Sequence, residues 1–136
     1  MTTMDDEGKQ LIGAWRLVDF SGDDYAMRTR GAKPTGMVIY DATGVMSLQI
    51  MPDVAIRSAF AAKEPTAEEA KAAFTGYQAY FGTYSVDTRT KTVTHHLAGN
   101  LDPGQIDNRT RTYELIGPDR LVLRINSRTL TWERVK

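Results

Sequence analysis

The feature that most constrains the fold is a succession of short segments rich in β-branched and aromatic residues, separated by turn-forming residues. Each segment has the length of a strand. Eight segments are predicted to be β-strands: 14–21, 35–40, 44–51, 82–87, 91–98, 108–116, 120–126 and 128–134. The chain is therefore predicted to be mainly β.

The connections between these segments are alternately tight and long. Three of them carry residues typical of hairpin turns: Asp41–Gly44, Asp87–Thr90 and Gly117–Asp119. Three others are long: 22–34, 52–81 and 99–107. In an up-and-down antiparallel sheet this pattern gathers the long loops at one end. Closure of the eight strands into a barrel removes exposed edges, whereas the alternative is an open α+β sheet with a helix across one face.

One helix is predicted over 66–81, between the third and fourth strands. Thr66 and Glu69 form a capping box that starts it. Apolar side chains then recur at helical spacing on one face: Ala67, Ala70, Phe74, Tyr77 and Phe81. This face is expected to cover the open end of the barrel as a lid.

Composition limits the possible classes of protein. The 136 residues, of which 41% are hydrophobic and 25% charged, suit a single domain over 1–136. Seventeen basic residues balance seventeen acidic ones, so nucleic acids and anionic membranes are not expected partners. Cysteine is absent, which excludes disulfides and thiolate metal sites. With a polar first segment and no membrane-length apolar run, the chain is expected to be cytoplasmic, as a monomer or homodimer.

Several motifs, in order along the chain, resemble the lipocalin-like domain family of small bacterial and fungal cytosolic proteins. They are GAWRLVDF with its Gly13-x-Trp15, the Y-x3-G-x-M-S-x-Q-x-M run over 40–51, GYQAYFGTYSVD, TVTHH, DRLVL and LTWER. The resemblance spans about 11–134 and implies an eight-stranded barrel around one small ligand. It also implies that Arg134 covers Trp15 by a cation–π contact. The segment 98–105 departs from the family pattern, because it has no aromatic residue near its proline.

Alternation along the strands sorts the candidate site residues. Val93 and His95 share an apolar face, so His95 is predicted to point inward and His96 outward. Adjacent histidines on a strand cannot bind one metal ion, and nucleotide-binding glycine motifs are absent, so neither metal nor cofactor is expected. Pairing Val86 with Val93 places Tyr84 opposite His95.

Two further strands contribute candidates. Arg111 shares a face with Tyr113 and is predicted to point inward, the alternative being an inverted register that exposes it. On 44–51 the pattern is ambiguous, and the family resemblance favours Ser47 and Gln49 as inward-facing. A polar patch is then predicted on the cavity wall, composed of Gln49, Tyr84, His95 and Arg111.

Two main functions follow from this arrangement. The first is binding of a small, largely apolar molecule with an anionic or carbonyl end. Its expected ligand contacts are Gln49, Ser47, Tyr77, Tyr113, Met51 and Phe74. The second is a cofactor-independent isomerase, cyclase, hydratase or other lyase, in which His95 is the general acid and base. Tyr84 and Arg111 would then stabilise an enolate or oxyanion. A structural or partner-binding role is a third possibility, and His95, Tyr84 and Tyr113 could equally be satisfied core residues.

Overall fold

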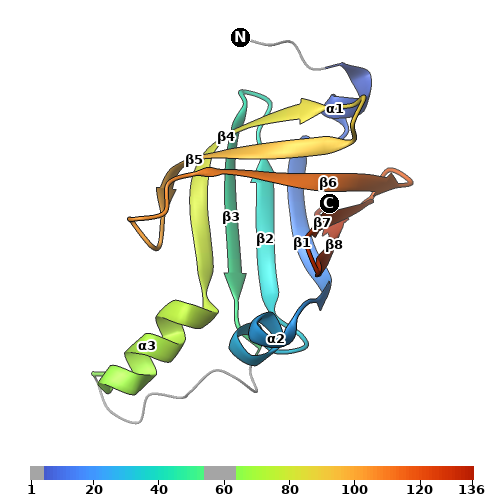
Figure 1. Ribbon diagram of the computed structural model, residues 1–136. Coiled ribbons are helices and arrows are strands. Elements are labelled where there is room, and N and C mark those ends of the chain that lie inside the picture. The colour runs from blue at the N-terminus through green and yellow to red at the C-terminus, as the bar shows by residue number, and fades with distance from the viewer. Residues whose placement is uncertain (1–4, 54–63) are drawn as a thin grey trace.

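Eight antiparallel strands close into a barrel in the computed structural model, which describes residues 5–53 and 64–136. Each strand pairs with the next in sequence, and the last pairs with the first (Figure 1). The strands are β1 (Gly13–Ser21), β2 (Thr35–Tyr40), β3 (Val45–Met51), β4 (Gln78–Asp87), β5 (Thr92–Asn100), β6 (Asn108–Ile116), β7 (Arg120–Ile125) and β8 (Arg128–Arg134). The predicted up-and-down barrel is confirmed, and the open-sheet alternative is wrong.

The register between β4 and β5 agrees with the prediction from sequence. Val86 pairs with Val93, and Tyr84 pairs with His95. A bulge beside Gly82 shifts the register further along this pair of strands. The ideal position of a Cβ on Gly82 lies 1.9 Å from the carbonyl oxygen of His96, so only glycine permits this close approach.

The predicted helix is present but shorter than expected. α3 (Ala67–Gly76) begins with the predicted capping box, in which Thr66 and Glu69 bond each other's backbone N–H groups. It ends at Gly76, and Tyr77 already has extended backbone angles. Tyr80 and Phe81 therefore lie on β4, where they alternate inward and outward. The predicted end of the helix at residue 81 is therefore wrong, because the apolar residues after Gly76 belong to a strand.

Two short helices were not predicted. α1 (Asp6–Lys9) is capped by Asp5, and α2 (Asp24–Arg30) is capped by Asp23 and followed by Gly31 at φ 81°. α2 lies in the β1–β2 connection at the same end of the barrel as α3 (Figure 1). α1 lies at the opposite end, where the Glu7 carboxylate accepts hydrogen bonds from Lys91 and Tyr113.

The end of the barrel beside α1 is closed by Leu11, Trp15 and Arg134, of which the family resemblance indicated Trp15 and Arg134. Leu11 is fully buried, and the Trp15 indole donates to its carbonyl oxygen at 2.9 Å. The Arg134 guanidinium lies over the Trp15 ring, 4.2 Å from its centre. Arg134 also donates to the carbonyl oxygens of Gln10 and Ile12. It thereby ties the last strand to the segment before the first and confirms the predicted contact.

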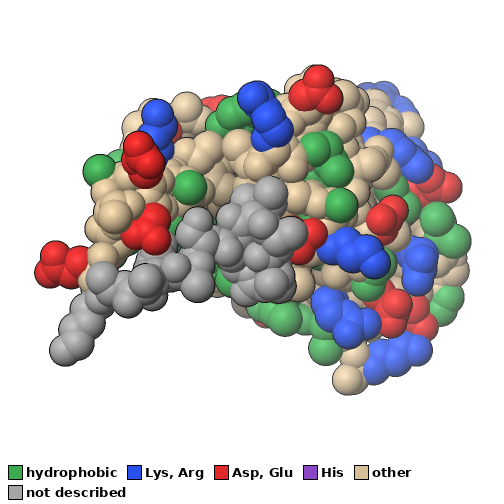
Figure 2. Space-filling model, turned by 90° about the horizontal axis from the view of Figure 1, so that it is seen from below, with side chains coloured by type: hydrophobic (Ala, Val, Ile, Leu, Met, Phe, Trp, Pro, Cys, Tyr) green, Lys and Arg blue, Asp and Glu red, His purple; other side chains and the backbone are tan. Residues whose placement is uncertain are grey.

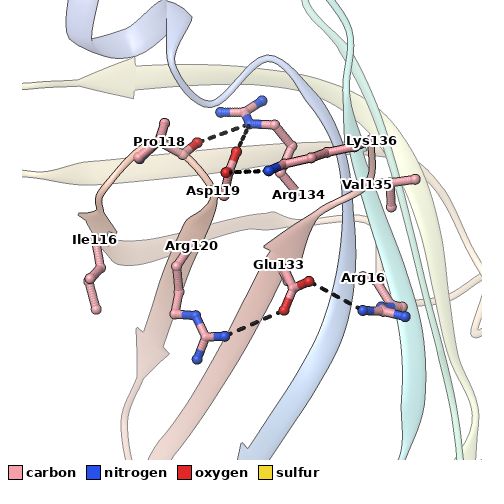
Figure 3. A pocket seen from close by; sticks show the side chains of 9 residues that line it. All are labelled: Arg16, Ile116, Pro118, Asp119, Arg120, Glu133, Arg134, Val135 and Lys136. Atoms are coloured by element: carbon pink, nitrogen blue, oxygen red, sulfur yellow. Dashed lines mark hydrogen bonds and ion pairs between the residues drawn. The ribbon is translucent and has the colours of Figure 1, made fainter.

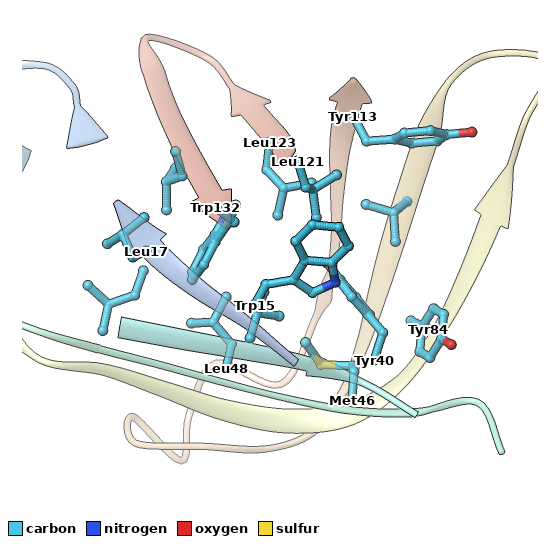
Figure 4. Close-up of a cluster of buried hydrophobic side chains, with 14 of the residues drawn as sticks. Trp15, Leu17, Tyr40, Met46, Leu48, Tyr84, Tyr113, Leu121, Leu123 and Trp132 are labelled. Carbon is cyan, nitrogen blue, oxygen red and sulfur yellow. The ribbon is translucent and has the colours of Figure 1, made fainter. Parts of the chain in front are cut away.

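The interior is mostly filled by large side chains (Figure 4). Trp15, Trp132, Tyr40 and Met46 are all completely or almost completely buried there. On β3 the inward residues are Met46, Leu48 and Ile50, so the apolar alternation determines the orientation of this strand. Ser47, Gln49 and Met51 consequently belong to the outer face, and the expectation that Ser47 and Gln49 point inward is wrong.

Charges of both signs are interspersed over the surface at the end that carries α2 and α3 (Figure 2). At the other end, a groove of about 590 Å³ runs beside the start of β1 and the end of β8. Its charged side chains pair with one another: Glu133 with Arg16 and Arg120, and Asp119 with Arg134 and Lys136 (Figure 3). Each charged side chain of this groove is therefore engaged in an ion pair, with two carboxylates each shared by two cations.

Candidate functional site

A small cavity of about 30 Å³ lies inside the barrel towards the end that carries α2. Its volume suits one or two water-sized molecules. Apolar side chains from β3, β7 and β8 form much of its wall, among them Leu48, Leu123 and Leu130. Its polar groups come from β4, β5, β6, β8 and α2, and they are Gln78, Tyr80, His95, Arg111, Arg128 and Arg30.

His95 lines this cavity and is completely buried. Both of its ring nitrogens are engaged: Nε2 is 2.6 Å from the Tyr40 hydroxyl, and Nδ1 is 2.7 Å from the Tyr80 hydroxyl. The inward direction of His95 is as predicted. Its surroundings match the alternative of a core histidine whose hydrogen bonds are satisfied.

The electrostatic surroundings keep His95 neutral. Burial lowers its pKa to about 3, and the charges of Arg111 and Arg109 act in the same direction. The ring is therefore uncharged near neutral pH, with one N–H and one acceptor nitrogen. Because each of these already faces a tyrosine hydroxyl, His95 has no free nitrogen for a substrate.

Arginine side chains dominate the charge of the cavity. Arg30 is 8% exposed and Arg111 is 9% exposed, and burial lowers the pKa of both guanidinium groups. Arg128 also lines the cavity, with Asp23 3.7 Å away. Arg109 lies over the Tyr80 ring, 5.1 Å from its centre, and pairs with Asp107 at 3.4 Å. The inward orientation of Arg111 confirms the predicted parity of β6.

Several donors at the cavity have no partner in the described part of the chain. They are Nε and Nη1 of Arg30 and Nε1 of Trp132, and all three belong to residues that line the cavity. Among the described residues, the Arg111 guanidinium makes one hydrogen bond, a long one of 3.4 Å to the carbonyl oxygen of Thr110. No carboxylate is found among the described lining residues. The cavity therefore presents positive charge and unpaired donors with no carboxylate in its described lining, and the amide of Gln78 is a lining group that also carries an acceptor.

The structure brings together only part of the predicted site. Tyr84 points inward, but its hydroxyl donates to the carbonyl oxygen of Asp41, away from the cavity. Tyr113 is buried and donates to Glu7 at the end of the barrel beside α1. Phe74, on α3, is 49% exposed. None of these three is among the described residues that line the cavity.

The other predicted ligand contacts lie together outside the barrel. Tyr77 donates to the Gln49 side chain at 2.8 Å. With Ser47, Met51 and Met37 they line an open groove of about 370 Å³ on the outer face of β2 and β3. The expected patch of Gln49, Tyr84, His95 and Arg111 is thus reduced to His95 and Arg111.

Sequence reasoning missed Tyr40, Tyr80, Arg30 and Trp132 as cavity or network residues. Alternation on 35–40 would have placed Tyr40 beside Val38 on the inner face, and a strand starting at 78 would have done the same for Tyr80. For Arg30, Asp23 as a helix cap and Gly31 as a helix end could have predicted the helix that carries it. No pattern in the sequence predicts the direction of the Arg30 side chain.

Comparison with known proteins agrees with this fold. A family model for the lipocalin-like domain matches residues 12–135. The chain belongs to the lipocalin-like domain family. This membership and the closed barrel support small-molecule binding in general. No functionally curated protein matches the chain.

Two solved structures share the fold of this lipocalin-like domain. An uncharacterized protein from Bacteroides eggerthii has 12% identity and a TM-score of 0.54, with 92% of this chain and 99% of that one covered. A lipocalin-like protein from Bacteroides uniformis has 13% identity and a TM-score of 0.51, with coverage of 93% and 99%.

The described segments contain no cluster of three or more histidine, aspartate or glutamate side chains that could hold a metal ion. Within the same segments, no helix has the length and apolar character needed to cross a bilayer.

Proposed function

We propose that this lipocalin-like domain binds a small molecule through a carboxylate or similar anionic group held in the cavity beside Arg30 and Arg111. The unpaired donor atoms of Arg30 carry the proposal. A buried guanidinium whose Nε and Nη1 have no partner among the described residues is costly, and an anion would supply the missing acceptor and charge. Trp132 Nε1 offers a further donor at the same cavity.

The cavity has room for the anionic group of the ligand rather than for a large body. A longer ligand requires side chains at the α2 end to move, and Arg30 stands at the last position of that helix. Leu48, Leu123 and Leu130 would then contact the apolar part. We also propose that the protein is cytoplasmic and acts as a monomer or homodimer, as expected from its sequence.

The catalytic alternative has less support. A general acid and base must reach its substrate and change its protonation near the working pH. Both nitrogens of His95 face tyrosine hydroxyls, and its pKa of about 3 keeps it neutral. Tyr84, its proposed assistant, is bonded to Asp41 instead.

The test is calorimetric titration with acetate, with hexanoate and with hexanol as the neutral match for hexanoate. We expect acetate and hexanoate to bind, hexanoate more tightly, and hexanol to bind far more weakly. Arg30→Gln and Arg111→Gln should each weaken hexanoate binding by roughly 10- to 100-fold, because each removes a charge-assisted hydrogen bond.

Arg124→Gln is the matched control, since Arg124 is exposed on β7 and pairs with Glu114 on the outer surface. It should leave hexanoate affinity unchanged. Equal binding of hexanol and hexanoate, or equal losses in all three variants, would contradict an anion site at this cavity.

A further inference from the structure

We infer that Tyr80 donates its hydroxyl proton into the cavity as a ligand-binding group, and that Tyr40 fixes this direction by acting through His95. The role of Tyr80 towards a ligand rests on the proposed anion site. The direction of the hydrogen bonds does not, because it follows from the buried network itself.

The network is a chain of three side chains from three strands. Tyr40 on β2 contacts Nε2 of His95, and Tyr80 on β4 contacts Nδ1. Tyr80 lines the cavity, whereas Tyr40 does not. Tyr40 is completely buried within the cluster of large side chains (Figure 4).

A neutral His95 permits two arrangements of protons. In the first, Nε2–H donates to Tyr40, and Tyr80 donates to Nδ1. In the second, Tyr40 donates to Nε2, and Nδ1–H donates to Tyr80. In the first arrangement the imidazole does not accept the Tyr40 proton, and in the second it does not accept the Tyr80 proton.

Satisfaction of the buried groups distinguishes these arrangements. The Tyr40 hydroxyl has no other hydrogen-bond partner among the described residues, so the first arrangement leaves a fully buried O–H unpaired. The second leaves only the Tyr80 proton, which faces a cavity where water or a ligand can accept it. The second arrangement is therefore favoured, with the proton of His95 on Nδ1.

Arg111 is compatible with this direction at Tyr80. Burial raises the pKa of Tyr80, and the positive charge of Arg111 opposes this rise. A guanidinium carries no acceptor, so Arg111 cannot take the Tyr80 proton. The phenol remains protonated at neutral pH and has its proton available for the cavity.

This direction defines the class of ligand group. With Tyr80 as donor, Arg30, Arg111, Trp132 and Tyr80 each present an N–H or O–H to the cavity, whereas the lining Gln78 amide carries both a donor and an acceptor. The site then favours a group with acceptors only, such as a deprotonated carboxylate. It disfavours the corresponding primary amide, whose NH2 group would meet mostly donors.

The first test is the tautomer of His95 in ¹⁵N-labelled protein without ligand, read near neutral pH by long-range nitrogen–proton correlation. We expect the proton on Nδ1. A proton on Nε2 would overturn the inference, whatever the outcome of the binding experiments. The proton on Nδ1 together with failure of acetate and hexanoate to bind would overturn the anion site and the ligand role of Tyr80, but leave the network direction standing.

The second test compares Tyr40→Phe and Tyr80→Phe by titration with hexanoate, with Tyr25→Phe as control because Tyr25 is exposed on α2. Tyr80→Phe should weaken binding by roughly 10-fold or more through loss of a donor to a charged group. Tyr40→Phe should weaken it by a smaller factor and also make the His95 tautomer mixed. A purely structural Tyr40 would lower stability while the tautomer and affinity stay unchanged, and that result would contradict the inference.

Discussion

At the scale of single residues, alternation along a strand is a reliable guide where both faces differ clearly. It correctly predicted inward His95 and Arg111, because each shares a face with valine or tyrosine. On β3 the apolar residues Met46, Leu48 and Ile50 predict the inward face correctly, whereas the family motif does not. Gln49 therefore lies on the outer face. Arg30 could not be predicted as a cavity residue, because it stands on a short helix in a long connection.

Replacement of Arg30 by methionine should stabilise the protein without ligand while abolishing hexanoate binding. The buried guanidinium has two nitrogens without a partner in the described segments, and removing such a group recovers about 1–3 kcal/mol of unfolding free energy. Urea unfolding measures the change. Arg28→Met, on the exposed side of the same helix, should have little effect. A clear loss of stability in Arg30→Met would show that Arg30 has structural partners and contradict its assignment to a ligand.

At the scale of elements, whether a segment is a helix or a strand was easier to predict than the residue at which it ends. The capping box correctly placed the start of α3, because it satisfies backbone groups locally. The end was misjudged because Tyr77 and Phe81 fit a helical period, whereas Tyr80 and Tyr84 fit a strand. α2, which contributes Arg30 to the cavity, was missed although Asp23 and Gly31 bound it.

Loss of the α2 cap should loosen this helix and weaken the site. In Asp23→Ala the amide of Ala26 loses its acceptor, so the amides of α2 should exchange with solvent roughly five-fold faster. Hexanoate affinity should fall as well, because Arg30 ends the helix. Hydrogen exchange resolved by residue measures the first effect. Asp24→Ala is the control, and equal acceleration in both variants would contradict a specific role for the cap.

At the scale of the whole molecule, the alternation of tight and long connections predicted an up-and-down sheet and favoured a barrel, with an open α+β sheet as the alternative. Pairing of β1 with β8 closes the ring, and the segment around α1 and Leu11 seals one end. The sequence pattern could not predict how full the interior is. That depends on how Trp15, Trp132 and Tyr40 fit together, which only the packed structure determines.

Stability of the molecule should fall on mild acidification because of His95. Its pKa is about 3 when folded and near 6.5 when unfolded, so the unfolded chain binds an extra proton between these values. The unfolding free energy should decrease by about 1.4 kcal/mol per pH unit from about pH 6.5 to about pH 4.5, above the range where most carboxylates titrate.

Urea unfolding at several pH values measures this slope. His95→Gln should lose it, whereas His96→Gln, altered on the outer face, should keep it. A slope that survives in His95→Gln would assign the acid sensitivity to another group.

Closure of the ring also has a consequence for biosynthesis. Arg16 and Glu133, which pair across β1 and β8, are 117 positions apart in the chain. β1 leaves the ribosome before β8, so one edge of β1 stays uncovered until β8 has been synthesised and pairs with it. Folding should be slow for a domain of this size, and the uncompleted sheet is the stage most exposed to aggregation.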